Sequence, residues 1–137
     1  MAAKQAYNVE RFFQALGDQT RLRLLNLMSD QETCVCYFVE ILGGPQPKIS
    51  RHLAYLRSAG IVDARREGKW MRYRIVMPPH IGAAQILKQT LEWLKDEKLM
   101  QADRARLIRA CCFPAEYPSL DGAPLPAPIQ DPAFEAC

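Results

Sequence analysis

The sequence predicts a mostly α-helical fold that carries one β-hairpin, and three observations support this prediction. Apolar residues recur with helical spacing through the first 60 residues. The period changes over residues 61–76, where two runs of strand-forming residues flank the turn sequence EGK. Helical spacing returns near residue 81 and lasts to about residue 111, in a chain of 137 residues whose length favours one domain.

The first two predicted helices are separated by a glycine and an aspartate. The first helix ends at Gly17, and Asp18 is the expected N-cap of a second helix over residues 19–28. The apolar face of the first helix follows the i, i+3, i+4, i+7 pattern and consists of Val9, Phe12, Phe13 and Leu16.

Two more helices are predicted on either side of the turn sequence GGP at residues 43–45. Thr33 is the expected N-cap of the third helix. The fourth helix covers about residues 46–59, and its inward seam is expected to be Ile49, Leu53, Leu56 and Gly60.

The helix that begins near Ile81 is apolar on two sides. A small core needs only one apolar stripe, so the second stripe predicts a partner helix from an identical subunit, and hence a homodimer. A last helix is expected over residues 101–111. The two stripes are Ala84, Leu87, Leu91 and Leu94, and Ala83, Ile86 and Trp93.

The last 25 residues differ in composition from the rest of the chain. Residues 113–137 contain six of the ten prolines, four acidic residues and no lysine or arginine. We therefore predict one folded and dimerising domain over residues 1–112, and a disordered, Pro-rich acidic tail over residues 113–137.

The basic charge is concentrated in one segment of that domain. Residues 1–112 hold 18 basic and 11 acidic residues, a net charge of +7, and residues 48–74 contain eight of the basic ones. Such a local concentration indicates a polyanionic partner. Short helices followed by a basic hairpin describe a winged helix-turn-helix that binds double-stranded DNA.

The fourth helix would then enter the major groove, and the hairpin would contact the flanking phosphates. The predicted DNA-binding residues on the helix are Gln46, Lys48, Ser50, Arg51, His52 and Tyr55, and those on the hairpin are Arg65, Arg66, Lys69 and Arg72.

Three sequence blocks carry a resemblance to a known family. FFQALGDQTRLRLLNLM, PQPKISRHLAYLRSAGIV and REGKWMRYRI resemble, in order and spacing, the signature blocks of the ArsR/SmtB repressors. The resemblance covers about residues 8–110 and departs at Gln19, where the family usually has proline. It implies a homodimeric winged-helix repressor that releases its operator when a metal or metalloid binds.

The five cysteines predict reactive thiols in a reducing compartment, because their number is odd and the chain lacks the character of a small secreted domain. We expect a cytoplasmic protein without a membrane span. Cys34 and Cys36 would diverge in a regular helix, where residues i and i+2 lie about 200° apart. They can converge only at a frayed first turn, where the helix dipole favours thiolate.

The CVC sequence resembles the thiolate motif of arsenic- and antimony-responsive relatives, and of cadmium- and lead-responsive ones. The resemblance implies As(III) or Sb(III), inorganic or methylated, as inducer. Val39 occupies the position of the third cysteine in the arsenical pattern, so Cys111 or Cys112 is the candidate third thiolate. This pair either joins the CVC site, within or across subunits, or forms its own site.

Three other functions compete with a metalloid-responsive repressor. A cadmium- or lead-responsive repressor and a thiol redox regulator both fit the same scaffold. An enzyme fits worst, because the sequence has no CxxC, no Gly-rich nucleotide loop and no acid-base cluster. Cys137, at the end of the tail, is expected to be dispensable.

Overall fold

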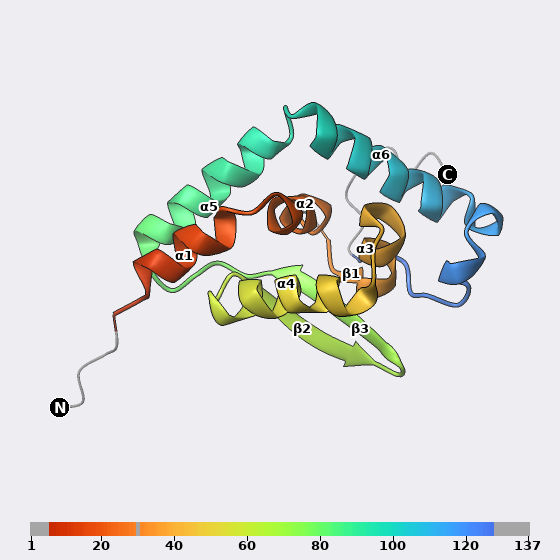
Figure 1. Ribbon diagram of the computed structural model, residues 1–137, viewed down its shortest axis with the longest axis horizontal. Coiled ribbons are helices and arrows are strands. Elements are labelled where there is room, and N and C mark those ends of the chain that lie inside the picture. The colour runs from red at the N-terminus through yellow and green to blue at the C-terminus, as the bar shows by residue number, and fades with distance from the viewer. Residues whose placement is uncertain (1–5, 30, 128–137) are drawn as a thin grey trace.

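The computed structural model describes residues 6–29 and 31–127 of the chain. The arrangement is that of a winged helix-turn-helix, which confirms the predicted fold class (Figure 1). Within the described ranges the elements are α1 (Val9–Leu16), α2 (Gln19–Leu27), β1 (Thr33–Cys34), α3 (Val35–Leu42), α4 (Gln46–Ser58), β2 (Val62–Glu67), β3 (Trp70–Ile75), α5 (Ile81–Leu94), α6 (Lys98–Cys112) and the 3-10 turns η1 (Pro114–Glu116) and η2 (Pro118–Leu120).

The helix boundaries follow from local capping. Asp18 caps α2 as predicted, and its carboxylate accepts a hydrogen bond from the backbone N–H of Arg21 at 3.0 Å. Gly43 and Gly44 separate α3 from α4 with φ angles of 75° and 87°. Glycine adopts two such angles in succession without strain, so the two residues let the chain turn sharply from α3 into α4.

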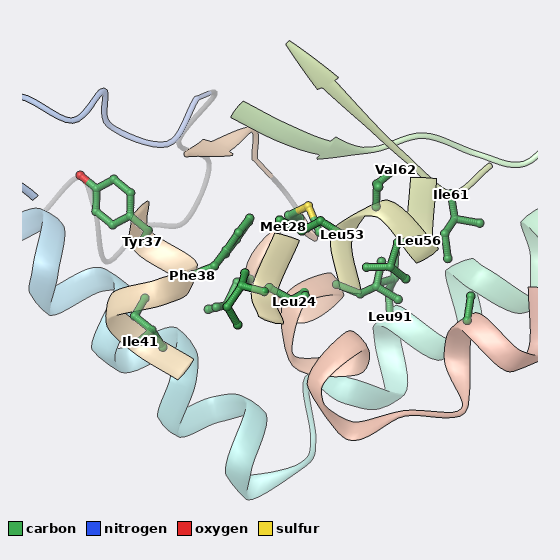
Figure 2. Close-up of a cluster of buried hydrophobic side chains, with 14 of the residues drawn as sticks. Leu24, Met28, Tyr37, Phe38, Ile41, Leu53, Leu56, Ile61, Val62 and Leu91 are labelled. Atoms are coloured by element: carbon green, nitrogen blue, oxygen red, sulfur yellow. The ribbon is translucent and has the colours of Figure 1, made fainter. Parts of the chain in front are cut away.

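The core lies where α2, α3, α4 and the hairpin meet, and Figure 2 shows its side chains converging from these elements. The predicted inward seam of α4 is confirmed, because Ile49, Leu53 and Leu56 are each at most 1% exposed. This packing fixes which face of α4 is turned outward. The side chains labelled in Figure 2 are Leu24, Met28, Tyr37, Phe38, Ile41, Leu53, Leu56, Ile61, Val62 and Leu91.

The predicted hairpin is joined by a short strand that the sequence did not indicate. The antiparallel order is β1-β3-β2, and Cys34 of β1 pairs with Arg72 of β3. A strand of two residues is too short to show alternation, so it has no sequence signal. Its effect is to attach the segment before α3 directly to the hairpin.

Helices α1 and α5 each have an apolar side that faces away from the core. On α1, Phe12 is buried, whereas Val9 and Phe13 are 61% and 51% exposed, so the four-residue face predicted from spacing is split. The prediction that α5 is apolar on two sides is confirmed, although Ala83 belongs to the inner stripe. Its exposed apolar residues are Ile81, Ile86 and Trp93.

The chain after α6 differs from the predicted disordered tail as far as residue 127. It forms η1 and η2, buries Leu120 and returns to the sheet, where Ala127 pairs with Glu32 (Figure 1). Disorder was predicted because the segment shows no helical or strand period. A segment that is held in place by one buried apolar residue and by backbone pairing has no such period either. Residues 128–137, including Cys137, lie outside the described residues. No helix in the described ranges is long and apolar enough to cross a membrane.

Candidate thiol site and nucleic-acid interface

Cys34 precedes the first turn of α3 instead of belonging to it. Its backbone is extended, with φ −68° and ψ 142°, and it occupies the N-cap position, which corrects the expectation that Thr33 is the cap. The Thr33 hydroxyl is buried and has no hydrogen-bond partner in the described part of the chain. The extended backbone at Cys34 removes the divergence that a helical i, i+2 pair would have.

The two sulfurs of the CVC sequence therefore converge. The Cys36 thiol donates to the sulfur of Cys34 across 2.9 Å, and both cysteines are free. This hydrogen bond lowers the pKa of Cys34 and raises that of Cys36, because it stabilises a thiolate on one sulfur and holds the proton on the other. Cys34 is fully buried and Cys36 is partly exposed, so a ligand approaches from the side of Cys36.

Cys111 of α6 and the CVC pair both interact with the same tyrosine, Tyr37, within one subunit. The Tyr37 hydroxyl donates to the Cys111 sulfur, and burial raises the pKa of Cys111 to about 11 and also raises that of Tyr37. Both side chains line a cavity of about 460 Å³ under η2. Cys112 follows at the last turn of α6, partly exposed. No three Cys, His or carboxylate residues among those described are placed to hold one metal ion.

The exposed face of α4 carries part of the predicted DNA-binding set. Gln46, Lys48 and Arg51 are exposed and Ser50 is partly exposed, on the side opposite the buried seam. These side chains are available to base edges and phosphates.

His52 and Tyr55 were predicted to face DNA, but they brace α4 against α1 and α2. The Tyr55 hydroxyl donates to the Gln14 side chain at 2.8 Å, and the guanidinium of Arg21 stacks on its ring at 4.3 Å. Arg21 also lies 3.4 Å from the ring of His52. Partial burial lowers the pKa of His52, which favours the neutral imidazole.

The predicted basic residues of the hairpin divide into two groups. Arg66 and Lys69 are exposed near the hairpin turn and can reach a DNA backbone. Arg65 is exposed but paired with the carboxylate of Glu32 at 2.5 Å. Arg72 is only 5% exposed, so its side chain is not available to a phosphate in this conformation. Its side chain turns toward β1, a strand that the sequence did not predict.

Glu32 and Tyr37 are the site residues that the sequence reasoning missed. Glu32 joins the hairpin to the segment before the thiols, and Tyr37 interacts with both Cys36 and Cys111. The only sequence signal for either residue is that it lies close to the CVC sequence. Closeness in sequence does not show which distant side chain the residue contacts.

The exposed basic face of α4, with a sheet and hairpin beside it, defines a winged helix-turn-helix DNA-binding protein. The family described as "Bacterial regulatory protein, arsR family" matches residues 18–64. The arsenical resistance operon repressor of Escherichia coli K12 is 41% identical over 105 residues, which are 74% of this chain and 86% of that protein. The chain belongs to the ArsR family, and is a DNA-binding transcriptional repressor rather than an enzyme.

Other relatives agree with this assignment. The arsenic resistance transcriptional regulator ArsR1 of Pseudomonas putida is 41% identical over 96 residues, 66% of this chain and 75% of that protein. The homodimeric winged helix-turn-helix DNA-binding domain of Mb0332 from Mycobacterium bovis has a TM-score of 0.52 and 29% identity, and the match covers 74% of this chain and 95% of that domain.

Proposed function

We propose that this chain is a homodimeric repressor that releases operator DNA when trivalent arsenic or antimony binds to the thiolates of Cys34 and Cys36. The observation that carries this proposal is the 2.9 Å separation of the two sulfurs at the start of α3. Two converging soft donors, one with a lowered pKa, suit a soft, thiophilic ion. The relatives that are named for arsenic resistance support the same ligand class.

Cys111 is the favoured third thiolate, from the same subunit. Its sulfur accepts a hydrogen bond from Tyr37, which also lies near Cys36, so a three-sulfur site requires this hydrogen bond to break. A methylated arsenical needs only two sulfurs, and leaves this contact intact. The Cys111→Ser variant therefore separates an inorganic from a methylated inducer.

Release of DNA requires a ligand that prefers one conformation over the other. A metalloid that bound both conformations equally would shift nothing. The thiol pair lies where β1 ends and α3 begins. Helix α3 leads through the two-glycine turn into α4, the helix proposed to contact DNA. A change at Cys34 therefore reaches that helix over a short connection. By reciprocity, operator DNA weakens metalloid binding by the same factor.

The test is fluorescence anisotropy of the reduced protein on DNA from its own promoter, titrated with arsenite. We expect release near one arsenite per subunit in the wild type, and continued binding in Cys34→Ser and Cys36→Ser. An unchanged arsenite response in both variants would contradict the assigned site. Antimonite, methylarsenite, cadmium and lead, titrated in turn, identify the inducer class.

Contact between the two sulfurs also favours a second candidate, a thiol redox response on the same scaffold. Oxidation would join Cys34 and Cys36 in a disulfide and release two electrons and two protons to an oxidant such as peroxide. DNA release by peroxide in metal-free buffer, reversed by a thiol reductant and absent with arsenite, would favour this candidate over the metalloid repressor.

The homodimer is proposed from the outer faces of α1 and α5. Phe13 and Leu16 line a hollow of about 960 Å³ together with Trp93, Leu94 and Leu99. Exposed apolar residues gathered around such a hollow indicate a protein interface. A two-fold dimer through this face sets two α4 helices toward two half-sites of an operator.

A further inference from the structure

Arg72 is a buried cation enclosed by three segments that are distant in sequence. Its Nε lies 3.3 Å from a carboxylate oxygen of Glu32, and its Nη1 lies 3.3 Å from one of Glu67. Its Nη2 donates to the backbone carbonyl of Leu125 at 2.8 Å. The guanidinium therefore connects the segment before the thiols, the end of β2 and the chain that follows α6.

The backbone of Arg72 is also tied to the thiol site. Arg72 and Cys34 are register partners in the antiparallel β1-β3 pair. Glu32, two residues before Cys34, exchanges both backbone hydrogen bonds with Ala127. A displacement of Cys34 therefore moves both the backbone partner and a side-chain partner of Arg72.

The far end of this arrangement is the hairpin turn. Glu67 is the last residue of β2, and Lys69, exposed on the turn, is two residues further on. A buried guanidinium is costly unless it is paired, and the planar fork of arginine suits several acceptors at once. The Nη atoms of Arg72 donate to Glu67, to the backbone carbonyl of Glu32 and to that of Leu125, whereas its buried Nε is held near the Glu32 carboxylate by charge and has no hydrogen-bond partner among the described residues. Such a residue holds its partners in one relative arrangement.

We propose that Arg72 is a positioning residue that transmits the state of the thiol pair to the wing, an inference that rests on the function proposed above. When a ligand enters between the sulfurs of Cys34 and Cys36, which lie 2.9 Å apart without it, the two thiolates are spread and Glu32 and β1 shift. Arg72 passes this shift to Glu67, and the turn that carries Lys69 leaves its place on the DNA backbone. The wing is thereby released together with α4.

A double-mutant cycle tests the connection without any ligand. Operator affinity is measured for Glu32→Gln, Glu67→Gln and the double variant. We expect the combined loss to differ from the product of the single losses by about 2- to 150-fold, the range for residues in one network. In the Arg72→Gln background this factor falls to one. A factor of one in the otherwise wild-type protein overturns the proposal.

Arg65 is the matched control, because it contacts the same two carboxylates from the exposed side of the hairpin. The coupling between Glu32 and Glu67 should persist in Arg65→Gln and disappear only in Arg72→Gln. Loss in Arg65→Gln with persistence in Arg72→Gln assigns the connection to Arg65 and overturns the proposal. Thermal unfolding of each variant confirms that a folded protein is compared.

Measurements with arsenite distinguish a failure of this proposal from a failure of the function on which it rests. Arg72→Gln should still bind arsenite, which is measured by the thiolate-to-arsenic absorption band. The ratio of its operator affinity without arsenite to that with arsenite should fall toward one. A wild-type ratio in Arg72→Gln overturns the inference. Lys69→Gln should lower the ratio in part, because the contact that the ligand breaks is already absent, and should lose about one unit of salt slope. If the wild type itself ignores arsenite, the proposed function fails, and the cycle still decides the role of Arg72.

Discussion

At the scale of single residues, the environment of a charge decides its role more than its position in the sequence. Arg66 and Arg72 belong to the same basic hairpin, yet one is exposed and the other is buried beside β1. The difference arises because β1 pairs with the middle of β3, at Arg72 and Tyr73, and the carboxylate of Glu32 comes with that strand. Counting charges cannot separate these two arginines.

The Glu32 carboxylate is expected to stabilise the fold in a pH-dependent way. Its hydrogen bonds from Arg65 hold its pKa below the usual value, and its side chain is 12% exposed. The stabilisation is therefore fully present above the unfolded-state pKa of about 4.3, and is lost as pH falls through the lowered folded-state pKa. Glu32→Gln should reduce the free energy of unfolding by about 1.5–3 kcal/mol at neutral pH.

Urea denaturation of the wild type and of Glu32→Gln over descending pH measures this contribution. The difference between the two proteins should shrink through the acidic range. If the difference in unfolding free energy between the two proteins does not change with pH, the effect of Glu32→Gln comes from side-chain packing and not from the charge of Glu32. Glu10→Gln, an exposed carboxylate on α1, is the control and should change stability little at any pH.

At the scale of elements, the sequence predicted the parts that obey a period. The seam of α4 repeats with helical spacing, and the hairpin alternates around a turn, so both were found. β1 and the segment over residues 113–127 were missed, because they are held by backbone pairing to distant residues. The thiol pair was located by its spacing, but its convergence depends on β1 keeping Cys34 outside the helix.

The two DNA-contacting elements should contribute differently to operator recognition. Arg51 is exposed on α4 and can fork to guanine, so Arg51→Ala should cost about 1–3 kcal/mol on the operator and less on unrelated DNA. Lys69 lies on the hairpin turn, so Lys69→Ala should weaken both DNAs alike and lower the salt slope by about 1.

Anisotropy titrations on both DNAs over a series of salt concentrations make this comparison. Equal losses on operator and unrelated DNA for Arg51→Ala would reassign Arg51 to a phosphate contact. His52→Ala tests whether this histidine contacts DNA, as the sequence predicts, or packs α4 against α2. It should lower stability, through its packing against α2, more than it lowers discrimination between the two DNAs.

At the scale of the whole molecule, the single subunit leaves apolar surface that its own core does not use. Phe13, Ile81 and Trp93 are each more than half exposed, on the two helices whose opposite sides supply Phe12 and Leu87 to the core. The sequence indicates this face on α5, because that helix is apolar on two sides. It does not indicate it on α1, where a single helical pattern contains both the buried Phe12 and the exposed Phe13. A protein that reads a two-fold operator has a use for such a face.

Trp93→Glu should therefore separate the subunits while leaving each one folded. A carboxylate at a site that is 65% exposed in the subunit costs little there, but is desolvated when a partner covers it. Light scattering should give half the wild-type mass, and operator affinity should fall by about 100-fold or more, because two half-sites no longer bind as one unit. Ala105→Glu, exposed on α6, is the control for added charge. A Trp93→Glu protein that keeps the wild-type mass would place the dimer on another face.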